Sequence, residues 1–177
     1  MTKRPPRYDL PNAAPGSLRL VQLFLNSSSH DTGLELLGTP AQLAGWFAER
    51  QLPIERVGPA ALQRAWNLRV ELRALVSSGC APGSVLQNAA RRARITIDLT
   101  EPRLVPQAQG LDGALGLMLI AVYDSIRDGT WSRLKTCRNC GWAYWDNSKN
   151  RSGAWCSMQL CGSRLKVRRY RDRQRAA

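Results

Sequence analysis

The sequence predicts a mainly α-helical fold with a small β element, an α+β fold, that ends in a compact cysteine-rich module. Apolar residues recur every three or four positions in several segments between residues 17 and 132, a spacing typical of helices with one buried face. One short segment instead alternates apolar and polar residues, as a half-buried strand does. Four of the five cysteines fall between residues 137 and 161. A chain of 177 residues can form one domain with a small module attached.

The first 16 residues predict a disordered arm. They contain four prolines and few apolar side chains, so they cannot bury enough surface to offset the entropy that ordering costs. They also lack the apolar core of a signal peptide. No run of about 18 apolar residues, the length that spans a bilayer, occurs in the sequence. We therefore expect a cytoplasmic protein.

Three helices are expected in the first half of the α-rich domain, residues 17–132. Apolar residues with helical spacing follow Ser17, although a short strand is an alternative there. Thr39 provides an N-cap and Pro40 the first helical position of a second helix, which ends near Gln51. Pro59 opens the third helix, the longest of this part, whose apolar residues recur every three or four positions.

The second half of this domain is expected to contain two more helices around one hairpin. The first helix runs from Ser84 to about Arg94, and the second covers Gly113–Arg127. Between them, Ile95–Leu99 alternates apolar and polar residues, and Arg103–Val105 follows a Glu–Pro turn. This pattern predicts two short paired strands, the small β element of the fold.

Residues 17–132 show no catalytic constellation in the sequence. His30, the only histidine, stands beside Asp31, but a solvated loop histidine is a simpler interpretation than half of a general-base pair. Cys80 follows a helix end and has no basic neighbour to lower its pKa, so we interpret it as a structural thiol. We expect that the protein is not an enzyme.

The remaining cysteines have the spacing of a four-thiolate zinc site. Cys137 and Cys140 form one close pair, Cys156 and Cys161 form another, and fifteen residues separate the pairs. Each pair supplies one edge of a tetrahedron, and the spacer is long enough to fold back. With four thiolates as ligands no position is left for a catalytic water, so the single Zn²⁺ is structural. A redox dithiol and an iron–sulfur site are the alternatives, because both also use clustered thiolates.

Aromatic residues occupy the spacer between the cysteine pairs. Trp142, Tyr144 and Trp145 precede the turn-rich residues 146–150, and Trp155 follows them. This pattern predicts a short hairpin between the pairs whose aromatic side chains cover the metal. The second pair lies where a helix begins. Residues 133–177 are therefore predicted to form a treble-clef-like or ribbon-like zinc module that ends in a basic helix.

Positive charge is concentrated in this module. Residues 1–132 contain 14 Lys and Arg against 11 Asp and Glu, whereas residues 133–177 contain 12 against 2. This asymmetry is typical of a segment that binds an acidic partner, nucleic acid above all. A membrane surface is the weaker alternative, because the segment lacks a wide apolar face opposite its charges.

A helix over residues 164–175 would gather guanidinium groups on one face. Each planar guanidinium can bind two phosphate oxygens or the O6/N7 edge of guanine. Asp172 is the only acidic residue there, which argues against a merely solvated helix. The candidate nucleic-acid-binding residues are Arg164, Lys166, Arg168, Arg169, Arg171, Arg173 and Arg175.

Four motifs carry a resemblance to a known family. They read Cys137-x2-Cys140-Gly141-Trp142, Asp146-x-Ser148-Lys149-Asn150, Trp155-Cys156-Ser157-Met158-x2-Cys161-Gly162-x-Arg164 and Lys166-Val167-Arg168-Arg169-Tyr170-Arg171. Together they resemble the CGNR zinc finger, which is found at the C-terminus of bacterial proteins with an ABATE domain. The sequence departs from the name-giving motif at one position, with Ser163 in place of asparagine.

The front part is similar to the ABATE domain through two further motifs. These are Leu23-Phe24-Leu25-Asn26-Ser27 and Leu36-Leu37-Gly38-Thr39-Pro40-x2-Leu43-x2-Trp46. Proteins with this architecture are described as stress-induced transcription regulators. The resemblance implies that residues 17–132 sense a ligand or dimerise and that residues 133–177 bind DNA.

These observations predict a bacterial transcription regulator whose structural zinc module presents an arginine-rich helix to double-stranded DNA. A small-molecule effector and a second copy of the chain are the expected partners of the front domain, and no membrane partner is expected. One alternative is an RNA-binding protein, in which Trp142, Tyr144 and Trp145 stack on unpaired bases. A zinc-dependent nucleic-acid enzyme is another, and a protein-interaction module that binds an acidic partner is a third.

Overall fold

The computed structural model describes residues 12–29, 31–79, 81–163 and 174. The helices in these residues are α1 (Leu18–Leu25), α2 (Pro40–Ala48), α3 (Pro59–Ser78), α4 (Ser84–Ala93) and α5 (Gly110–Arg127). The strands form antiparallel pairs: β1 (Ser28–Ser29) with β2 (Leu34–Glu35), β3 (Ile95–Asp98) with β4 (Arg103–Pro106), and β5 (Leu134–Thr136) with β6 (Ala143–Trp145). Two short helical turns, η2 (Trp131–Arg133) and η3 (Met158–Gly162), complete these elements. The prediction of a mainly α fold with small β elements is confirmed.

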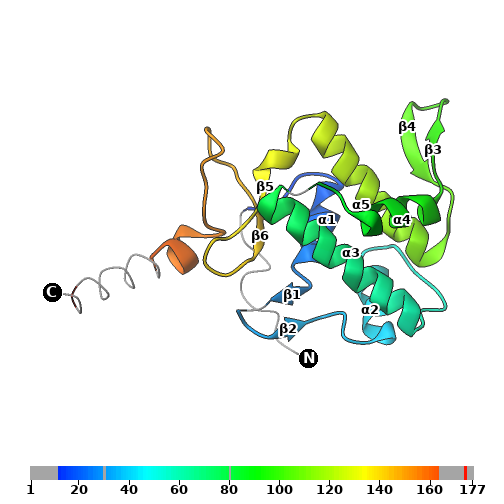
Figure 1. The fold of residues 1–177 in the computed structure, drawn as a ribbon, viewed down its shortest axis with the longest axis horizontal. Coiled ribbons are helices and arrows are strands. Elements are labelled where there is room, and N and C mark those ends of the chain that lie inside the picture. Colours follow the sequence, from blue (N-terminus) through cyan, green and yellow to red (C-terminus); the bar gives the residue numbers. More distant parts are fainter. Residues whose placement is uncertain (1–11, 30, 80, 164–173, 175–177) are drawn as a thin grey trace.

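The long helix α3 crosses the body of the molecule, and the other helices pack around it (Figure 1). Helices α1, α2 and α4 contact α3 directly, and α5 contacts α1 and α4. Their apolar faces meet in one buried cluster centred on Val21, Phe24, Phe47, Leu68 and Met118, none of which has any exposed surface. Burying one large apolar side chain of this kind contributes about 1.5–3 kcal/mol, so this cluster holds the helices in place. None of the helices in the described residues is long and apolar enough to cross a membrane.

The helix boundaries follow the expected local signals with two differences. Thr39 caps α2 as predicted, since its side-chain oxygen accepts a hydrogen bond from the Gln42 N–H at 3.2 Å. Ser17, in contrast, makes no side-chain cap for α1. Helix α5 begins at Gly110, three residues before the predicted start. The extra turn brings Leu111 into the core, where it is buried.

The β1–β2 pair was not expected, because its sequence is polar. Glu35 of β2 contacts the guanidinium group of Arg69 on α3, a residue that is almost fully buried. That group binds both carboxylate oxygens of Glu35, at 2.9 and 2.6 Å, and the Ser27 hydroxyl at 2.7 Å. Two parallel guanidinium–carboxylate bonds fix geometry as well as contributing energy. This ion pair, rather than apolar alternation, holds the two strands against α3.

The β3–β4 hairpin projects from the body beside α4 and α5 (Figure 1). Its bounds agree with the predicted strands to within one residue. Its register pairs Ile95 with Pro106 and Asp98 with Arg103. The small β element is thus in its predicted place.

The start of the cysteine-rich region shares the core of the helices. Leu134, Ala143 and Trp145, from β5 and β6, belong to the same buried cluster as the apolar residues of α1, α3 and α5. Ala14 is also buried there, so the disorder predicted for residues 1–16 does not extend to it, and residues 1–11 lie outside the described part. A single core therefore includes parts of both predicted units.

Candidate metal centre

The first two cysteines lie in the turn that joins β5 to β6. The Cys137 N–H donates to the Trp142 carbonyl at 2.8 Å, and the Gly141 N–H donates to the Cys137 carbonyl at 2.8 Å. These bonds close the turn tightly around Cys140. Gly141 has a φ of +70°, a left-handed conformation that glycine adopts without a Cβ clash. This turn, the metal knuckle, is therefore the connection of the β5–β6 hairpin.

The second pair of cysteines lies where a helical turn starts, as expected. Cys156 ends the long connection after β6, and Cys161 belongs to η3. Ser157 between them is extended, and its hydroxyl accepts a hydrogen bond from the Leu160 N–H at 3.3 Å. Its carbonyl accepts from the Cys161 N–H at 2.9 Å. This cap turns the chain so that Cys161 faces Cys156.

The structure brings all four predicted thiols together. Their Sγ atoms lie within 4.8 Å of one another. Three of the separations are 3.7 Å (Cys140 to Cys156), 3.6 Å (Cys156 to Cys161) and 3.6 Å (Cys161 to Cys140). Tetrahedral zinc with Zn–S bonds of about 2.3 Å requires S···S edges of about 3.8 Å, whereas a disulfide requires about 2.05 Å. The spacing fits one zinc ion and not a disulfide, and each of these cysteines is at most 8% exposed.

The thiols lie too close together for all of them to ionise without a cation. Hydrogen bonds with Cys140 and Cys156 lower the pKa of Cys137. The bond with Cys137 raises the pKa of Cys140 to about 12, and the bonds with both neighbours raise the pKa of Cys156. A divalent cation removes this conflict, because it stabilises every coordinating thiolate. The donor set therefore fits a structural zinc ion.

Three of the four aromatic residues in the spacer pack on the thiols, but the predicted hairpin between the cysteine pairs is wrong. Trp142 and Tyr144 are buried against the four cysteines, and the partly buried Trp155 packs on the same cluster. Trp145 points instead into the core of the helices. Strand β6 pairs with β5, which precedes the first cysteine. Successive residues of a strand face opposite sides, so Tyr144 faces the thiols whereas Ala143 and Trp145 face the helical core. The spacer after β6 contains no strand in the part that the structure describes.

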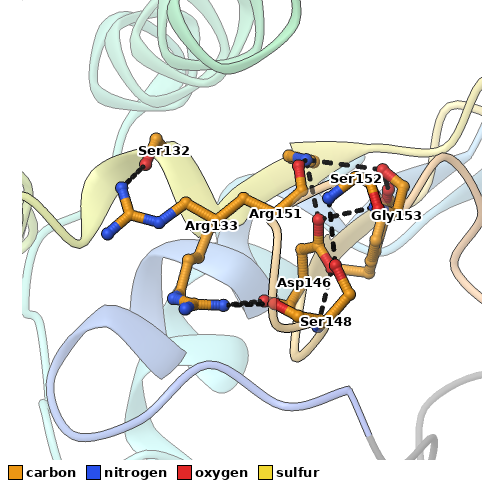
Figure 2. Close-up of polar contacts among 9 residues, drawn as sticks. Ser132, Arg133, Asp146, Ser148, Arg151, Ser152 and Gly153 are labelled. Carbon is orange, nitrogen blue, oxygen red and sulfur yellow. Dashed lines mark hydrogen bonds and ion pairs between the residues drawn. The ribbon is translucent and has the colours of Figure 1, made fainter.

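Asp146 organises the loop that connects β6 to the second cysteine pair (Figure 2). Its carboxylate is 3% exposed and accepts hydrogen bonds from the Lys135 ammonium group at 2.7 Å, the Ser148 N–H at 2.9 Å and the Gly153 N–H at 2.8 Å. A Cβ at Gly153 would lie 2.6 Å from an oxygen of this carboxylate, so only glycine allows this approach. The carboxylate draws both ends of the loop together and so sets the path of the chain to Cys156.

Two arginines fasten the same loop to the segment before β5 (Figure 2). Arg133 donates to the carbonyls of Asp146 and Ser148 at 2.8 and 3.0 Å. Arg151 donates to the Ser132 hydroxyl at 2.7 Å. The sequence predicts no role for Arg133 or Arg151. Asp146 is distinguished there only as part of a family motif and as one of the two acidic residues within residues 133–177.

The pKa values of Asp146 and Tyr144 shift in opposite directions, so that Asp146 stays charged and Tyr144 stays neutral. Burial opposes ionisation of the Asp146 carboxyl group, but the hydrogen bonds from Lys135, Ser148 and Gly153 outweigh it and hold its pKa well below its usual range. Burial, with the nearby charge of Asp146, raises the pKa of Tyr144. The Tyr144 hydroxyl stays protonated and donates to the Gly153 carbonyl at 2.8 Å. Asp146 and Tyr144 thus hold the same turn from two sides.

Two known families match separate parts of the chain. The ABATE family, whose description reads "Putative stress-induced transcription regulator", matches residues 18–125, more than half of the chain. The chain belongs to the ABATE family. The CGNR zinc finger matches residues 133–174, which contain all four clustered cysteines. Both resemblances seen in the sequence are thereby confirmed. No curated protein matched the chain.

The ABATE domain holds the CGNR finger through buried polar side chains of α1. The Asn26 amide donates to the Ala143 carbonyl and accepts from the Ala143 N–H, both at 2.8 Å, in the manner of a neighbouring strand. Gln22 donates to the same carbonyl at 3.2 Å. Buried amides that are paired in this way specify one arrangement, because any other would leave polar groups without partners.

Further contacts reach the metal knuckle itself. Arg73 on α3 donates to the Gly141 carbonyl at 2.7 Å and also to the Leu25 carbonyl. Asn12 donates to the Cys156 carbonyl at 2.9 Å, and its own carbonyl accepts from the Trp145 N–H at 2.9 Å. The finger is thus held at its first cysteine pair by Arg73 of the ABATE domain and at its second pair by Asn12, which precedes that domain.

The candidate nucleic-acid-binding residues lie outside the part of the chain that the structure describes. This holds for Arg164, Lys166, Arg168, Arg169, Arg171, Arg173 and Arg175, and for His30 and Cys80. The described chain reaches Ser163, which has helical dihedral angles and donates from its hydroxyl to the Gln159 carbonyl at 2.5 Å.

Proposed function

We propose that this ABATE-family protein is a transcription regulator that binds double-stranded DNA through the arginine-rich residues 164–175. In this proposal Cys137, Cys140, Cys156 and Cys161 ligate one structural zinc ion, which fixes the start of that segment. The position of Cys161 carries the proposal. It lies within the thiol cluster and only three residues before Arg164. Its neighbour Ser163 has helical backbone angles, which favours a helix over the segment that follows.

Charge supports nucleic acid as the partner of this segment. Four thiolates and one Zn²⁺ contribute a net charge of −2, so the formal charge of +13 stays strongly positive after metal binding. Charge of this sign and density, concentrated in one segment, binds phosphates. The proposed contacts are made by Arg164, Lys166, Arg168, Arg169, Arg171, Arg173 and Arg175.

The ABATE domain is proposed to regulate the finger in a bacterial cytoplasm, by binding an effector or by dimerisation. The described contacts from α1 and α3 to β6 and the knuckle give a direct route for such regulation. Catalysis at the metal is disfavoured in this proposal, because four thiolates leave zinc no position for water. The metal would then act only as a scaffold.

Burial of the aromatic residues favours duplex DNA over single-stranded RNA. Trp142, Tyr144 and Trp145 are 5%, 3% and 8% exposed, so their faces are covered by protein. Stacking on unpaired bases needs an open aromatic face. The RNA-binding alternative would therefore have to rely on the arginine-rich segment alone.

The salt dependence of binding tests the proposal. If about five side chains contact phosphates, log K should fall with log salt with a slope of roughly −4.5. Replacing Arg168 and Arg171 together by glutamine should weaken binding to every duplex and reduce the slope by about 2. The measurement is fluorescence anisotropy of labelled duplexes from about 50 to 300 mM salt, a range over which such binding changes strongly.

A charge-matched control separates local contacts from general electrostatics. Arg103 and Arg127 are exposed residues of the ABATE domain. Their replacement by glutamine removes the same charge and should leave the slope almost unchanged. Equal effects of the two double variants would contradict a binding site at residues 164–175. Tighter binding to single-stranded RNA than to duplex DNA at the same salt would support the RNA-binding alternative.

A further inference from the structure

A cleft with positively charged walls lies between α3, α4 and α5, in the ABATE domain. Its volume is about 450 Å³, which lies within the range of pockets that hold small molecules. Helix α3 contributes Arg64 and Asn67, and α5 contributes Asp112 and Leu115. The side of α4 that faces them completes the cleft. In Figure 1 helix α4 lies on the right of the molecule and the turn η3, in orange, on the left.

The cleft contains more cationic than anionic side chains. Its charged lining residues are Arg64, Arg91, Arg92 and Asp112, which leaves two positive charges in excess. Asp112 is shared between Arg64 and Arg92, with both nitrogen–oxygen distances at 3.5 Å. Charge-assisted hydrogen bonds are normally about 2.7–2.9 Å long. Neither guanidinium group is therefore fully engaged by this carboxylate.

Arg64 is only partly engaged by acceptors in the residues that the structure describes. Its side chain is 35% exposed, its Nη2 atom lies 3.5 Å from the Asp112 carboxylate, and its buried Nε atom makes no hydrogen bond. Its exposed guanidinium nitrogens can therefore bind an anion that enters the cleft. Arg91 donates to the Asn88 side chain at 2.8 Å, which holds a second guanidinium group at the opposite wall.

The inner surface of the cleft is apolar. Val85 and Ala89 of α4 and Leu115 of α5 form it, and Leu115 is part of the main core. An inorganic anion would leave this surface unused. A pocket that combines an apolar surface with a few convergent polar groups is typical of an organic ligand.

We propose that this cleft binds a small organic anion, in which a carboxylate or phosphate group is attached to an apolar body. The anionic group would lie between Arg64, Arg91 and Arg92, and the body would lie on Val85, Ala89 and Leu115. A nucleic-acid backbone fits less well, because its phosphates carry no apolar group that would fill the inner surface. The site does not depend on the proposed DNA binding of the finger, so each can fail without the other.

Calorimetry with four small probes tests the proposal on the full-length, zinc-loaded chain. Phenyl phosphate and benzoate carry both required features and should bind with dissociation constants at or below about 1 mM, the range for ligands of about ten heavy atoms. Inorganic phosphate lacks the apolar body, and benzamide lacks the charge. Both should bind at least about tenfold more weakly. The stronger of the first two probes identifies the anionic group.

Substitutions then locate the site. Arg64→Gln and Arg91→Gln should each weaken the stronger probe roughly tenfold or more, as expected for one charge-assisted hydrogen bond, while Arg103→Gln should change nothing. Asp112→Asn should tighten binding several-fold, because it removes the carboxylate that competes with the ligand. A gain in affinity cannot arise from misfolding, so this variant keeps the test informative if the arginine variants are destabilised. No binding of either probe, equal binding of benzamide, or unchanged affinity in all three cleft variants would overturn the proposal.

Discussion

Replacing Asn26 by alanine should loosen the attachment of the CGNR finger to the ABATE domain. The Asn26 amide is 2% exposed and makes two hydrogen bonds of 2.8 Å with the backbone of Ala143. The Ala143 carbonyl keeps its bond to Gln22 in the variant, whereas the Ala143 N–H loses the Asn26 acceptor. A lost buried hydrogen bond costs about 0.5–1.5 kcal/mol, and a buried group left without a partner costs about 1–3 kcal/mol. We therefore expect a loss of about 3 kcal/mol.

Urea unfolding of the zinc-loaded protein measures this loss. With a slope of about 2 kcal/mol per molar urea, the midpoint should fall by about 1.5 M. The exposed Asn147, whose side chain makes one long contact of 3.4 Å with Asn12, provides a matched control. Asn147→Ala should change the stability by less than about 0.5 kcal/mol. A loss in Asn26→Ala no larger than in this control would refute the inferred attachment.

Two further changes test the loop and the metal. Asp146→Asn should destabilise the protein by about 3 kcal/mol, because it leaves Lys135 without its buried partner, while Asp98→Asn on the hairpin should cost far less. The Asp146 pKa is lower in the folded protein, so its contribution is complete above the unfolded value of about 4 and is lost as the pH falls below it. The difference in urea midpoint between the wild type and the variant should therefore be smaller at pH 3 than at pH 7. An equal difference at the two pH values would contradict this assignment. Removal of zinc by a chelator should lower the unfolding temperature of the ABATE helices as well as that of the finger, because both share one core. Circular dichroism at 222 nm measures the unfolding of the helices. An unchanged helical transition after zinc removal would show that the two parts are independent.

The helices and the thiol cluster could be predicted because their signals are local. Thr39 and Pro40 define the start of α2 within two residues, and Pro59 does so for α3. The spacing of the cysteines predicts a tetrahedral site, since each close pair forms one edge of the tetrahedron. Nothing distant in the sequence is needed for either inference.

Features that depend on distant residues could not be predicted. The β1–β2 pair is held by the ion pair of Arg69 with Glu35, which are 34 residues apart. The contact between Asn26 and Ala143 joins residues 117 positions apart. The sequence does not reveal these roles, because an asparagine or arginine that is buried in the fold is the same residue type as one that is exposed. The core that Leu134, Ala143 and Trp145 share with the helices also depends on contacts between distant residues.

The partner of β6 could not be predicted, because the sequence does not specify it. The aromatic pattern alone predicts that Trp142, Tyr144 and Trp145 all cover the metal. Successive residues of a strand face opposite sides, and the helical core takes up one of those sides at Trp145. Whether Trp145 covers the metal or enters the core depends on the apolar surface of the helices, which the sequence around Trp145 does not show.

DNA binding by a Cys161→Ser variant tests the central claim most directly. Cys161 is fully buried in the thiol cluster, and its replacement removes one of the four proposed zinc ligands without changing any basic side chain. Zinc content by mass spectrometry and duplex binding by anisotropy would be measured on the same sample. Ser163→Ala, which changes the residue directly before the basic segment, would be treated in parallel. We expect Cys161→Ser to lose its zinc and at least about tenfold in duplex affinity, because the metal folds the finger, and Ser163→Ala to keep both. Loss of the metal with unchanged duplex affinity would show that the arginine-rich segment binds without its scaffold and would contradict the proposed function.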